Sequence, residues 1–237
     1  MSRLDNVKRF YSLLASLEER LGGVARLAEC NGRLPWPKRG VYFFMEPTEF
    51  RTDSGMGPRV VRVGTHALKQ GSRATLWKRL SQHKGRLRSG GGNHRASVFR
   101  RLVGTALIES GGFDCPTWDD RSATASHEVR GGERPLEMAV SRTIGEMPFL
   151  WLPVEDEPGP SSLRGHIERN AIALLSNYAR QAIDPPSTSW LGNRCNREKI
   201  RESGMWNSNH VEERHDPGFL DEFANLVSHA EKLRCSS

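Results

Sequence analysis

Three short segments most limit the folds that this chain can adopt, because they have the composition of β-strands. Residues 40–45, 60–64 and 148–154 are rich in β-branched and aromatic side chains, which favour strands. A sheet of three strands is stable only when helices cover its apolar face. The sequence therefore predicts an α+β fold, in which a small three-stranded antiparallel sheet is flanked by helices.

Helical spacing of apolar residues accounts for much of the remaining chain. Over residues 4–29 it predicts one helix, or two if a pair of glycines breaks the run. Ser161 or Ser162 is placed to cap a helix that runs to about Arg180. Further helices are predicted over residues 73–84, 95–108, 135–146, 196–202 and 217–233, with a loop over 46–58 and an irregular segment over 113–133.

Length and composition exclude several classes of protein. The 237 residues are ample for a hydrophobic core without disulfide or metal staples. No stretch approaches the ~20 apolar residues of a spanning helix, and the first residues lack the basic-then-apolar layout of a secretory signal. The four cysteines form no CxxC pair, which indicates reduced thiols rather than a zinc ribbon or a disulfide framework. We therefore expect a cytoplasmic protein without membrane contact.

The positive charge is concentrated in one part of the chain. The net charge is +7, and residues 54–108 contain twelve Lys and Arg but no Asp or Glu. The rest of the chain is net acidic. A field of one sign attracts phosphodiester backbones, so we expect a nucleic-acid partner. The alternative is a solvated basic face without a partner.

Five side chains have the chemistry that phosphodiester hydrolysis needs. Arg79 and His83 are four residues apart and share a helix face, and an Arg fork can grip a phosphate. Glu168 lies in line with apolar residues on a helix, where a lone carboxylate can hold Mg²⁺. Tyr42 can act on water, and Arg62 lies beside it across a hairpin if the register allows. Taken singly, a strand Tyr usually packs, and a helix Arg or Glu is usually solvated or paired.

The order of these residues resembles the GIY-YIG nuclease family. That family has a Gly-Ile/Val-Tyr strand, a Tyr-Ile/Val-Gly strand, a helix with Leu-x-x-Arg-Leu-x-x-His/Tyr, and a later helix with Glu. Residues 40–42 fit the first element and residues 76–83 fit the third. Residues 149–154, followed by Glu168, fit the third strand and the metal-site helix. The resemblance covers roughly residues 38–190.

Two departures from the family pattern are plain. The second strand reads Arg-Val-Gly, so Arg62 replaces the second Tyr. Arg62 can contact phosphate but cannot act as a base, because a guanidinium stays protonated. The loop between the two motif strands is also longer than usual. The Asn that commonly follows the Glu helix has two candidate replacements here, Ser189 and Asn193.

The resemblance implies a role for each of these residues. Tyr42 would orient or deprotonate the attacking water, Arg79 would bind the scissile phosphate, and His83 would assist proton transfer. Glu168 would ligate one divalent metal, Mg²⁺ or Mn²⁺. The product would be a nicked or cut strand, and a homodimer could cut both strands. The basic residues expected to contact DNA are Arg62, Arg73, Lys78, Lys84, Arg86, Arg88, Arg95 and Arg100.

Two polar segments have both a structural and a functional interpretation. Residues 206–210, Trp-Asn-Ser-Asn-His, could read base edges or satisfy backbone groups in a tight loop. Residues 89–94 contain three consecutive glycines but lack the Lys-Ser/Thr ending of a P-loop, so they are predicted to be a flexible turn. The eight histidines have no HExxH spacing, and a zinc hydrolase is not indicated.

The leading interpretation is a metal-dependent endonuclease that hydrolyses phosphodiester bonds in DNA, with RNA as the alternative substrate. Residues 1–37 would form an N-terminal helical extension, 38–190 the GIY-YIG-like nuclease domain, and 191–237 a C-terminal helical extension packed on the same domain. One rival is a catalytically inactive nucleic-acid-binding module on a GIY-YIG scaffold, because Arg62 replaces a motif Tyr. The other is an unrelated structural or protein-interaction domain without affinity for nucleic acid.

Overall fold

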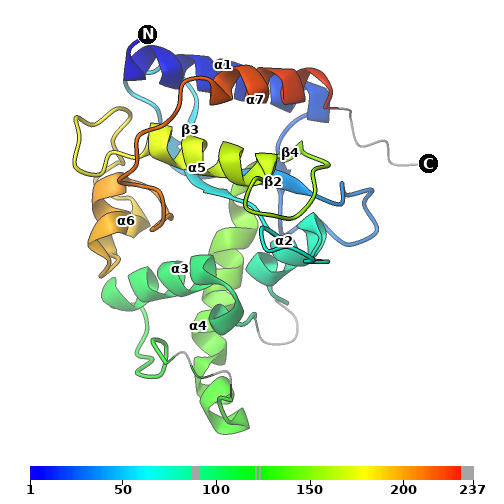
Figure 1. Cartoon of the computed structure of the whole chain (residues 1–237). Helices are drawn as coiled ribbons and strands as arrows, with labels where there is room; N and C mark the ends of the chain where they lie inside the picture. Colours follow the sequence, from blue (N-terminus) through cyan, green and yellow to red (C-terminus); the bar gives the residue numbers. More distant parts are fainter. Residues whose placement is uncertain (87–90, 121, 123, 231–237) are drawn as a thin grey trace.

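A four-stranded antiparallel sheet runs through the middle of the molecule (Figure 1). The computed structural model describes residues 1–86, 91–120, 122 and 124–230. In spatial order the strands are β1 (Ala25–Arg26), β4 (Pro148–Pro153), β2 (Gly40–Phe50) and β3 (Pro58–Gly64). The predicted α+β class and antiparallel sheet are confirmed. The prediction of three strands missed β1, which is two residues long and too short to carry a strand pattern.

Helices cover both faces of this sheet. They are α1 (Arg3–Leu21), α2 (Leu76–Lys84), α3 (Val98–Glu109), α4 (His127–Glu146), α5 (Leu163–Leu175), α6 (Glu198–Ser203) and α7 (Phe219–Ser228), with 3-10 turns η2 (His94–Ala96) and η3 (Leu191–Arg194). Phe43 of β2 contacts Phe10 and Phe223, whereas its neighbour Phe44 contacts Phe99. Successive strand residues point to opposite faces, so α1 and α7 lie on one face and α3 lies on the other (Figure 1).

Local signals decide where α1 and α4 begin and end. α1 ends at Gly22, which has a φ of 81°, so the predicted glycine break is confirmed. α4 begins after the cap residue Ser126, and the predicted start at residue 135 is wrong. Pro135 lies inside the helix instead. It is tolerated because the carbonyl that it leaves without a partner belongs to Gly131, which is exposed to water.

Two other elements differ in length from their predictions. α5 ends at Leu175 rather than near residue 180, because the Asn177 amide bonds to both backbone groups of Ile183 and holds the chain in a turn. β2 continues to Phe50 through register shifts, so part of the predicted 46–58 loop is strand. The C-terminal part of the predicted helix over 217–233 lies outside the described residues.

The two ends of the chain pack together over the sheet (Figure 1). Phe10 of α1 stacks on Phe223 of α7, with ring centroids 5.4 Å apart. Between α6 and α7, the backbone N–H of Trp206 donates to the carbonyl of Val61, 2.7 Å away. This segment therefore lies along the outer edge of β3. The predicted division around residues 38–190 stays a prediction.

Buried carboxylates tie the later part of the chain to β2. Glu46 is buried and accepts hydrogen bonds from the indole N–H groups of Trp190 and Trp206, at 3.0 and 2.6 Å. Glu49 is fully buried, pairs with Arg59, 2.8 Å away, and accepts hydrogen bonds from the N–H and the hydroxyl of Ser187. Removing these acids from water is costly unless they are bonded, so the contacts hold the strand and the C-terminal segments in one core.

None of the described helices has the length and apolar composition to cross a membrane. Cys30, Cys115 and Cys195 are free thiols. Cys235 lies outside the described residues.

Candidate active site

The phenol of Tyr42 lies against the backbone of Gly64 at the end of β3. The two residues are opposite each other in the β2–β3 pair, and a Cβ atom built on Gly64 would lie 2.3 Å from Tyr42 Oη. Any side chain at this position would therefore displace the phenol. Gly40 meets a similar constraint, because its Cβ would lie 2.5 Å from the carbonyl oxygen of Leu152 in β4. Close packing in the sheet thus requires both motif glycines.

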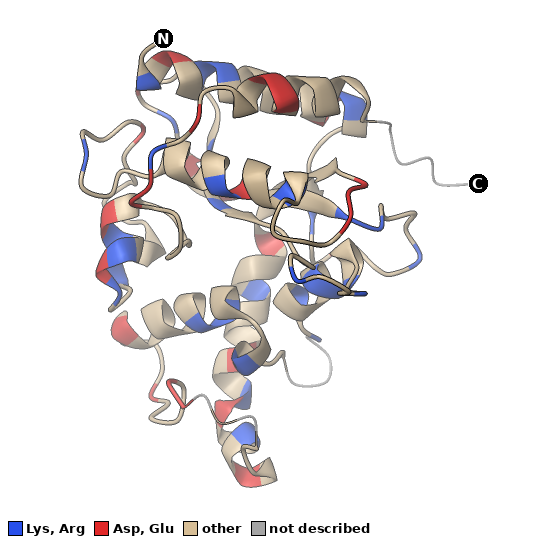
Figure 2. Cartoon of the chain, viewed as in Figure 1, with Lys and Arg blue, Asp and Glu red and all other residues tan. Residues whose placement is uncertain are grey.

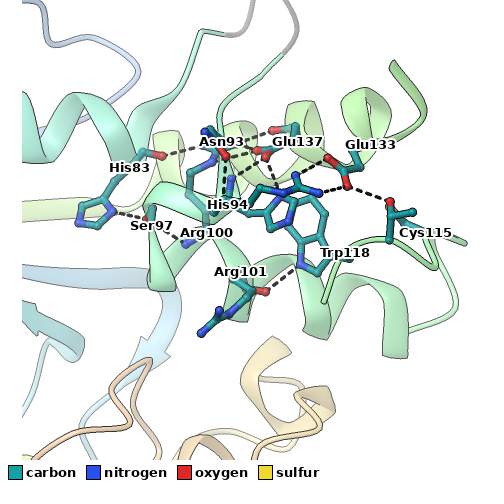
Figure 3. Close-up of polar contacts among 12 residues, drawn as sticks. His83, Asn93, His94, Ser97, Arg100, Arg101, Cys115, Trp118, Glu133 and Glu137 are labelled. Carbon is teal, nitrogen blue, oxygen red and sulfur yellow. Dashed lines mark hydrogen bonds and ion pairs between the residues drawn. The ribbon is translucent and has the colours of Figure 1, made fainter. Parts of the chain in front are cut away.

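A chain of hydrogen bonds leads from Tyr42 into the core. Tyr42 Oη lies 2.8 Å from His83 Nε2, and His83 Nδ1 lies 2.8 Å from Ser97 Oγ; Figure 3 shows the second contact. All three side chains are buried. Burial, together with the cations Arg79 and Arg62, holds the pKa of His83 well below its usual value, so the ring is neutral at physiological pH.

The register of the hairpin places Arg62 diagonally from Tyr42. Tyr42 pairs with Gly64, and Arg62 pairs with Phe44 two residues further along. The two side chains therefore point to the same face of the sheet without being directly opposite, at a separation that long side chains can bridge. The side-by-side arrangement expected from the sequence becomes a diagonal one.

The guanidinium of Arg62 is a buried cation. It lies 4.7 Å from the ring centroid of Phe99 and donates to the carbonyl of Trp206. Burial lowers the pKa of Arg62, while Tyr42 and Glu168 oppose that shift. Among the described residues, no carboxylate lies within ion-pair distance of it. Its charge is therefore available to stabilise negative charge in the site.

Glu168 reaches the same end of β3 from α5. Its Oε1 accepts a hydrogen bond from the Thr65 N–H, 3.1 Å away, and Thr65 directly follows Gly64. The side chain is half-buried. Burial raises the pKa of Glu168, whereas the neighbouring Arg62 and Arg79 favour its charged form. The carboxylate thus lies within the electrostatic reach of both guanidinium groups.

The predicted catalytic residues come together from three elements. Tyr42 is on β2, Arg79 and His83 are on α2, and Glu168 is on α5. Arg79 acts on the pKa values of both His83 and Glu168, which places it near both. Its Nη1 donates to Gln82 and to the carbonyl of Ala96, at 3.2 and 3.4 Å. The guanidinium makes no other hydrogen bond within the described structure, so its remaining N–H groups are free to bind an anion.

The match to a known domain extends over nearly the whole chain. A sequence model of the GIY-YIG domain matches residues 1–233. The chain belongs to the GIY-YIG family. Neither the curated proteins nor the solved structures contain a match to it. GIY-YIG proteins are typically nucleases that use divalent metals, so membership indicates a nucleic-acid substrate.

A divalent metal fits this GIY-YIG site through one carboxylate. The described residues contain no group of three or more His, Cys, Asp or Glu side chains that could hold a metal by themselves. Mg²⁺ does not need such a group, because it keeps several waters and is often held by one or two carboxylates and the substrate phosphate. Glu168 Oε2 has no hydrogen-bond partner among the described residues, so it is available as a ligand.

Acidic residues from α4 pair with two of the predicted DNA contacts. Arg95 makes two hydrogen bonds to Glu133, at 2.6 and 2.7 Å. Arg100 is fully buried against Glu137, and Figure 3 shows both acids beside the segment that follows α2. Lys84 donates to backbone carbonyls. The acid-free window of the sequence is therefore partly neutralised by residues that lie outside it.

The exposed cations lie on and around α2. Arg73, Lys78 and Arg86 are exposed, and no ion pair of theirs occurs in the described part of the chain. In Figure 2, α2 itself carries Lys and Arg without Asp or Glu. Arg88 lies outside the described residues. This cationic surface adjoins Arg79, the residue predicted to bind the scissile phosphate.

Of three further polar residues, the sequence analysis had considered Asn207 and Asn193 but not Ser97. Asn207 is buried and bonds to both the N–H and the carbonyl of Val63, at 3.1 and 2.9 Å, which matches the structural interpretation of residues 206–210. Asn193 donates to backbone carbonyls of its own turn instead. Ser97 caps α3 and contacts His83. A serine before a helix signals a cap, but nothing in the sequence signals its second partner.

Proposed function

We propose that this GIY-YIG protein is a metal-dependent endonuclease that hydrolyses phosphodiester bonds in DNA. The observation that carries the proposal is that a phenol and a carboxylate, Tyr42 and Glu168, reach the end of β3, with the guanidinium of Arg79 in electrostatic reach of Glu168. Hydrolysis forms a bond from a water oxygen to phosphorus and breaks one phosphorus–oxygen ester bond. The water loses one proton and the leaving oxygen gains one.

Each side chain takes one part of this reaction. Tyr42 orients the water and accepts its proton as the hydroxyl proton of Tyr42 passes to the neutral His83 across the hydrogen bond between Tyr42 Oη and His83 Nε2. Arg79 binds the scissile phosphate and stabilises the charge that develops on its oxygens. Glu168 would hold Mg²⁺ or Mn²⁺. When bound, such an ion polarises the phosphate and stabilises the leaving oxygen.

DNA would be held by the cations around α2. Arg73, Lys78 and Arg86 are exposed, so we assign them direct contacts to phosphates. Four of the other predicted contacts are engaged within the protein, so we assign them no phosphate contact. Arg62 and Lys84 donate to backbone carbonyls and keep their charge, whereas Arg95 and Arg100 pair with Glu133 and Glu137.

The test is cleavage of a supercoiled plasmid by the purified protein in Mg²⁺, with EDTA as the metal-free control. Glu168→Gln keeps the size of the side chain and removes its charge, so we expect loss of cleavage with little loss of DNA binding. Arg79→Ala should reduce cleavage more than binding. The matched control is Arg20→Ala, which removes an exposed arginine from the end of α1. Cleavage by Glu168→Gln at the wild-type rate would refute the proposal.

The second candidate function is nucleic-acid binding without cleavage. It is favoured by one observation: Arg62 stands where the family has a Tyr, and its side chain is committed to Phe99 and Trp206. This candidate predicts salt-dependent DNA binding and no nicking in Mg²⁺. Nicking that EDTA abolishes would exclude it.

Cleavage of both strands would need two copies of the chain. Each chain has one such site in its described residues, and one site cuts one strand at a time. We propose that nicked plasmid is the first product and that linear plasmid forms through a homodimer. The ratio of linear to nicked product should then rise with protein concentration, and a ratio independent of concentration would contradict the dimer.

A further inference from the structure

A hollow of about 950 Å³ opens beside α2. Its walls come from residues 28–32, from α2 and the two residues after it, and from residues 91–96. There is no Asp or Glu among the described residues that line it. Lys84 joins two of the walls, because its ammonium donates to the carbonyls of Ala28 and Cys30. A hollow of this size is typical of sites for small organic groups, and a lining without acids favours a ligand attached to an anionic chain.

The hollow adjoins the guanidinium that we expect to bind the scissile phosphate. Arg79 Nη1 donates to Gln82 Oε1 and to the carbonyl of Ala96, at 3.2 and 3.4 Å, and both of these residues line the hollow. A phosphate held by Arg79 would therefore bring its own nucleoside to the mouth of the hollow. A concave surface cannot reach the base edges of an intact duplex, so a base must leave the stack to enter.

Trp77 forms an aromatic wall that is held in place by the protein. Its ring stacks on that of Trp36, with centroids 5.2 Å apart and planes at 15°. Trp36 in turn contacts Trp151 and donates its indole N–H to the carbonyl of Asn31. A Cβ atom on Gly32 would lie 2.6 Å from the indole nitrogen of Trp77, so the backbone closes on that edge. Trp77 is only half-buried, and bases stack on such aromatic surfaces.

Three amide side chains also line the hollow: Asn31, Gln82 and Asn93. The oxygens of the two asparagines accept the backbone N–H groups of Arg33 and Arg95, at 2.8 and 3.0 Å. The oxygen of Gln82 accepts from Arg79. Each of these partners can only donate, so the atom that it meets must be the amide oxygen. The three NH₂ groups have no hydrogen-bond partner in the described part of the chain, so the hollow offers donors.

We propose that this hollow binds one extruded base beside the cleaved phosphate, and that guanine fits it better than adenine. Guanine presents two adjacent acceptors, O6 and N7, whereas adenine has a donor in place of one of them. A phosphate would satisfy the NH₂ groups but would leave the aromatic wall unused. This inference rests on the proposed nuclease function for the position of the cut, but binding of the base can be measured without cleavage.

The first test measures DNA binding by fluorescence anisotropy in EDTA, where metal-dependent cleavage is blocked. Two labelled duplexes share one sequence, and one of them carries a single unpaired guanine. We expect the protein to bind that duplex about tenfold more tightly than the paired one, as for a base that stacks on an aromatic side chain. An unpaired adenine, or a guanine analogue that lacks N7, should show a smaller preference. Equal affinities for the paired duplex and the duplex with guanine would overturn the inference.

Variants of α2 locate the preference in the hollow. Trp77→Ala should remove it and leave the affinity for the paired duplex unchanged, with Trp77→Leu in its place if that variant does not fold. The neighbouring exposed Lys78 is the matched control. Lys78→Ala should weaken the binding of both duplexes equally and keep the preference. A preference for the unpaired guanine that survives the loss of Trp77 would show that the base binds elsewhere and would overturn the inference.

The role of the donors is tested with Asn93→Asp. This change keeps the oxygen that caps η2 and removes the NH₂ group. Asn225→Asp makes the same change of charge at an exposed position of α7. We expect Asn93→Asp to reduce the preference for the unpaired guanine about fivefold, the loss of one hydrogen bond, and Asn225→Asp to leave it intact. The same response from both variants would contradict the proposed contact.

Nicking in Mg²⁺ separates this inference from the proposed function. The cut should map to a phosphate next to the unpaired guanine, and a cut elsewhere in the duplex would overturn the inference. Preference for the unpaired guanine without any nicking would refute the proposed function alone. Nicking of plasmid by a protein that does not prefer the unpaired base would refute the base site alone.

Discussion

Replacing Gly64 with Ala should disable the site without removing any reactive group. In the structure a Cβ atom on Gly64 would lie 2.3 Å from Oη, 2.4 Å from Cζ and 2.5 Å from Cε2 of Tyr42. Carbon atoms in contact prefer a separation of about 3.5 Å. The phenol must therefore move by roughly 1 Å, or β3 must separate from β2 by the same amount. Either movement breaks the 2.8 Å contact between Tyr42 Oη and His83 Nε2.

The size of the effect follows from this displacement. A misplacement of about 1 Å in a catalytic group costs about 10²-fold in rate, and overpacking of a core costs about 1–3 kcal/mol in stability. We therefore expect Gly64→Ala to lower the cleavage rate about 10²-fold while the protein stays folded at 25 °C. DNA affinity should change little, because the exposed cations around α2 are untouched.

The assay is plasmid nicking at saturating DNA, with thermal unfolding measured in parallel. Gly131→Ala is the matched control, because a Cβ on Gly131 of α4 would meet nothing within 4 Å. In a Tyr42→Phe background, Gly64→Ala should cause little further loss, because both changes act on the same hydroxyl. Wild-type nicking by Gly64→Ala, or a full additional loss in the Tyr42→Phe background, would refute the argument that Gly64 acts through Tyr42.

Three further predictions concern the buried and exposed charges. Arg100→Met should lower the free energy of unfolding by about 3–5 kcal/mol, because it leaves the buried Glu137 carboxylate without its cation; an unchanged urea midpoint would contradict this. Arg73→Met, at an exposed cation, should instead change the free energy of unfolding by less than about 0.5 kcal/mol. It should reduce the slope of log DNA affinity against log salt concentration by about one. An unchanged slope would remove Arg73 from the DNA contacts. Burial lowers the pKa of His66 to about 4 from its ordinary 6.5, and the charge of Arg164 contributes to this shift. Between pH 4 and pH 6.5 the unfolded state therefore binds a proton that the folded state does not. The free energy of unfolding should therefore fall by about 2 kcal/mol from pH 7 to pH 5 on account of this group, and His66→Gln should show a shallower fall; identical pH profiles would contradict the assignment.

The strands and the amphipathic helices could be predicted because their signals are local. Residues 40–45 and 60–64 carry a strand composition on their own, and a glycine pair ends α1 where the pattern breaks. β1 could not be predicted, because a two-residue strand exists only through its pairing with β4. The start of α4 was predicted too late because a proline usually opens a helix, whereas here Pro135 is tolerated within one.

The candidate site shows the same division between local and non-local information. The order of the motifs predicted, without coordinates, that Tyr42, Arg79, His83 and Glu168 belong to one site. The sequence could not reveal that acids from α4 neutralise part of the basic window, because Glu133 lies 38 residues from its partner Arg95. Ion pairing depends on distance in space and not on distance along the chain.

What the sequence determined by itself is the set of chemical groups and the short-range elements that carry them: a strand with a phenol, a helix with a guanidinium and an imidazole, and a helix with a carboxylate. The tertiary structure decided which of these groups are buried, which cations keep a free charge, and which partners the imidazole contacts. Burial and hydrogen bonding arise from contacts between segments far apart in the chain, such as Ser97 with His83 and Thr65 with Glu168. Those contacts exist only once the sheet and its covering helices have packed.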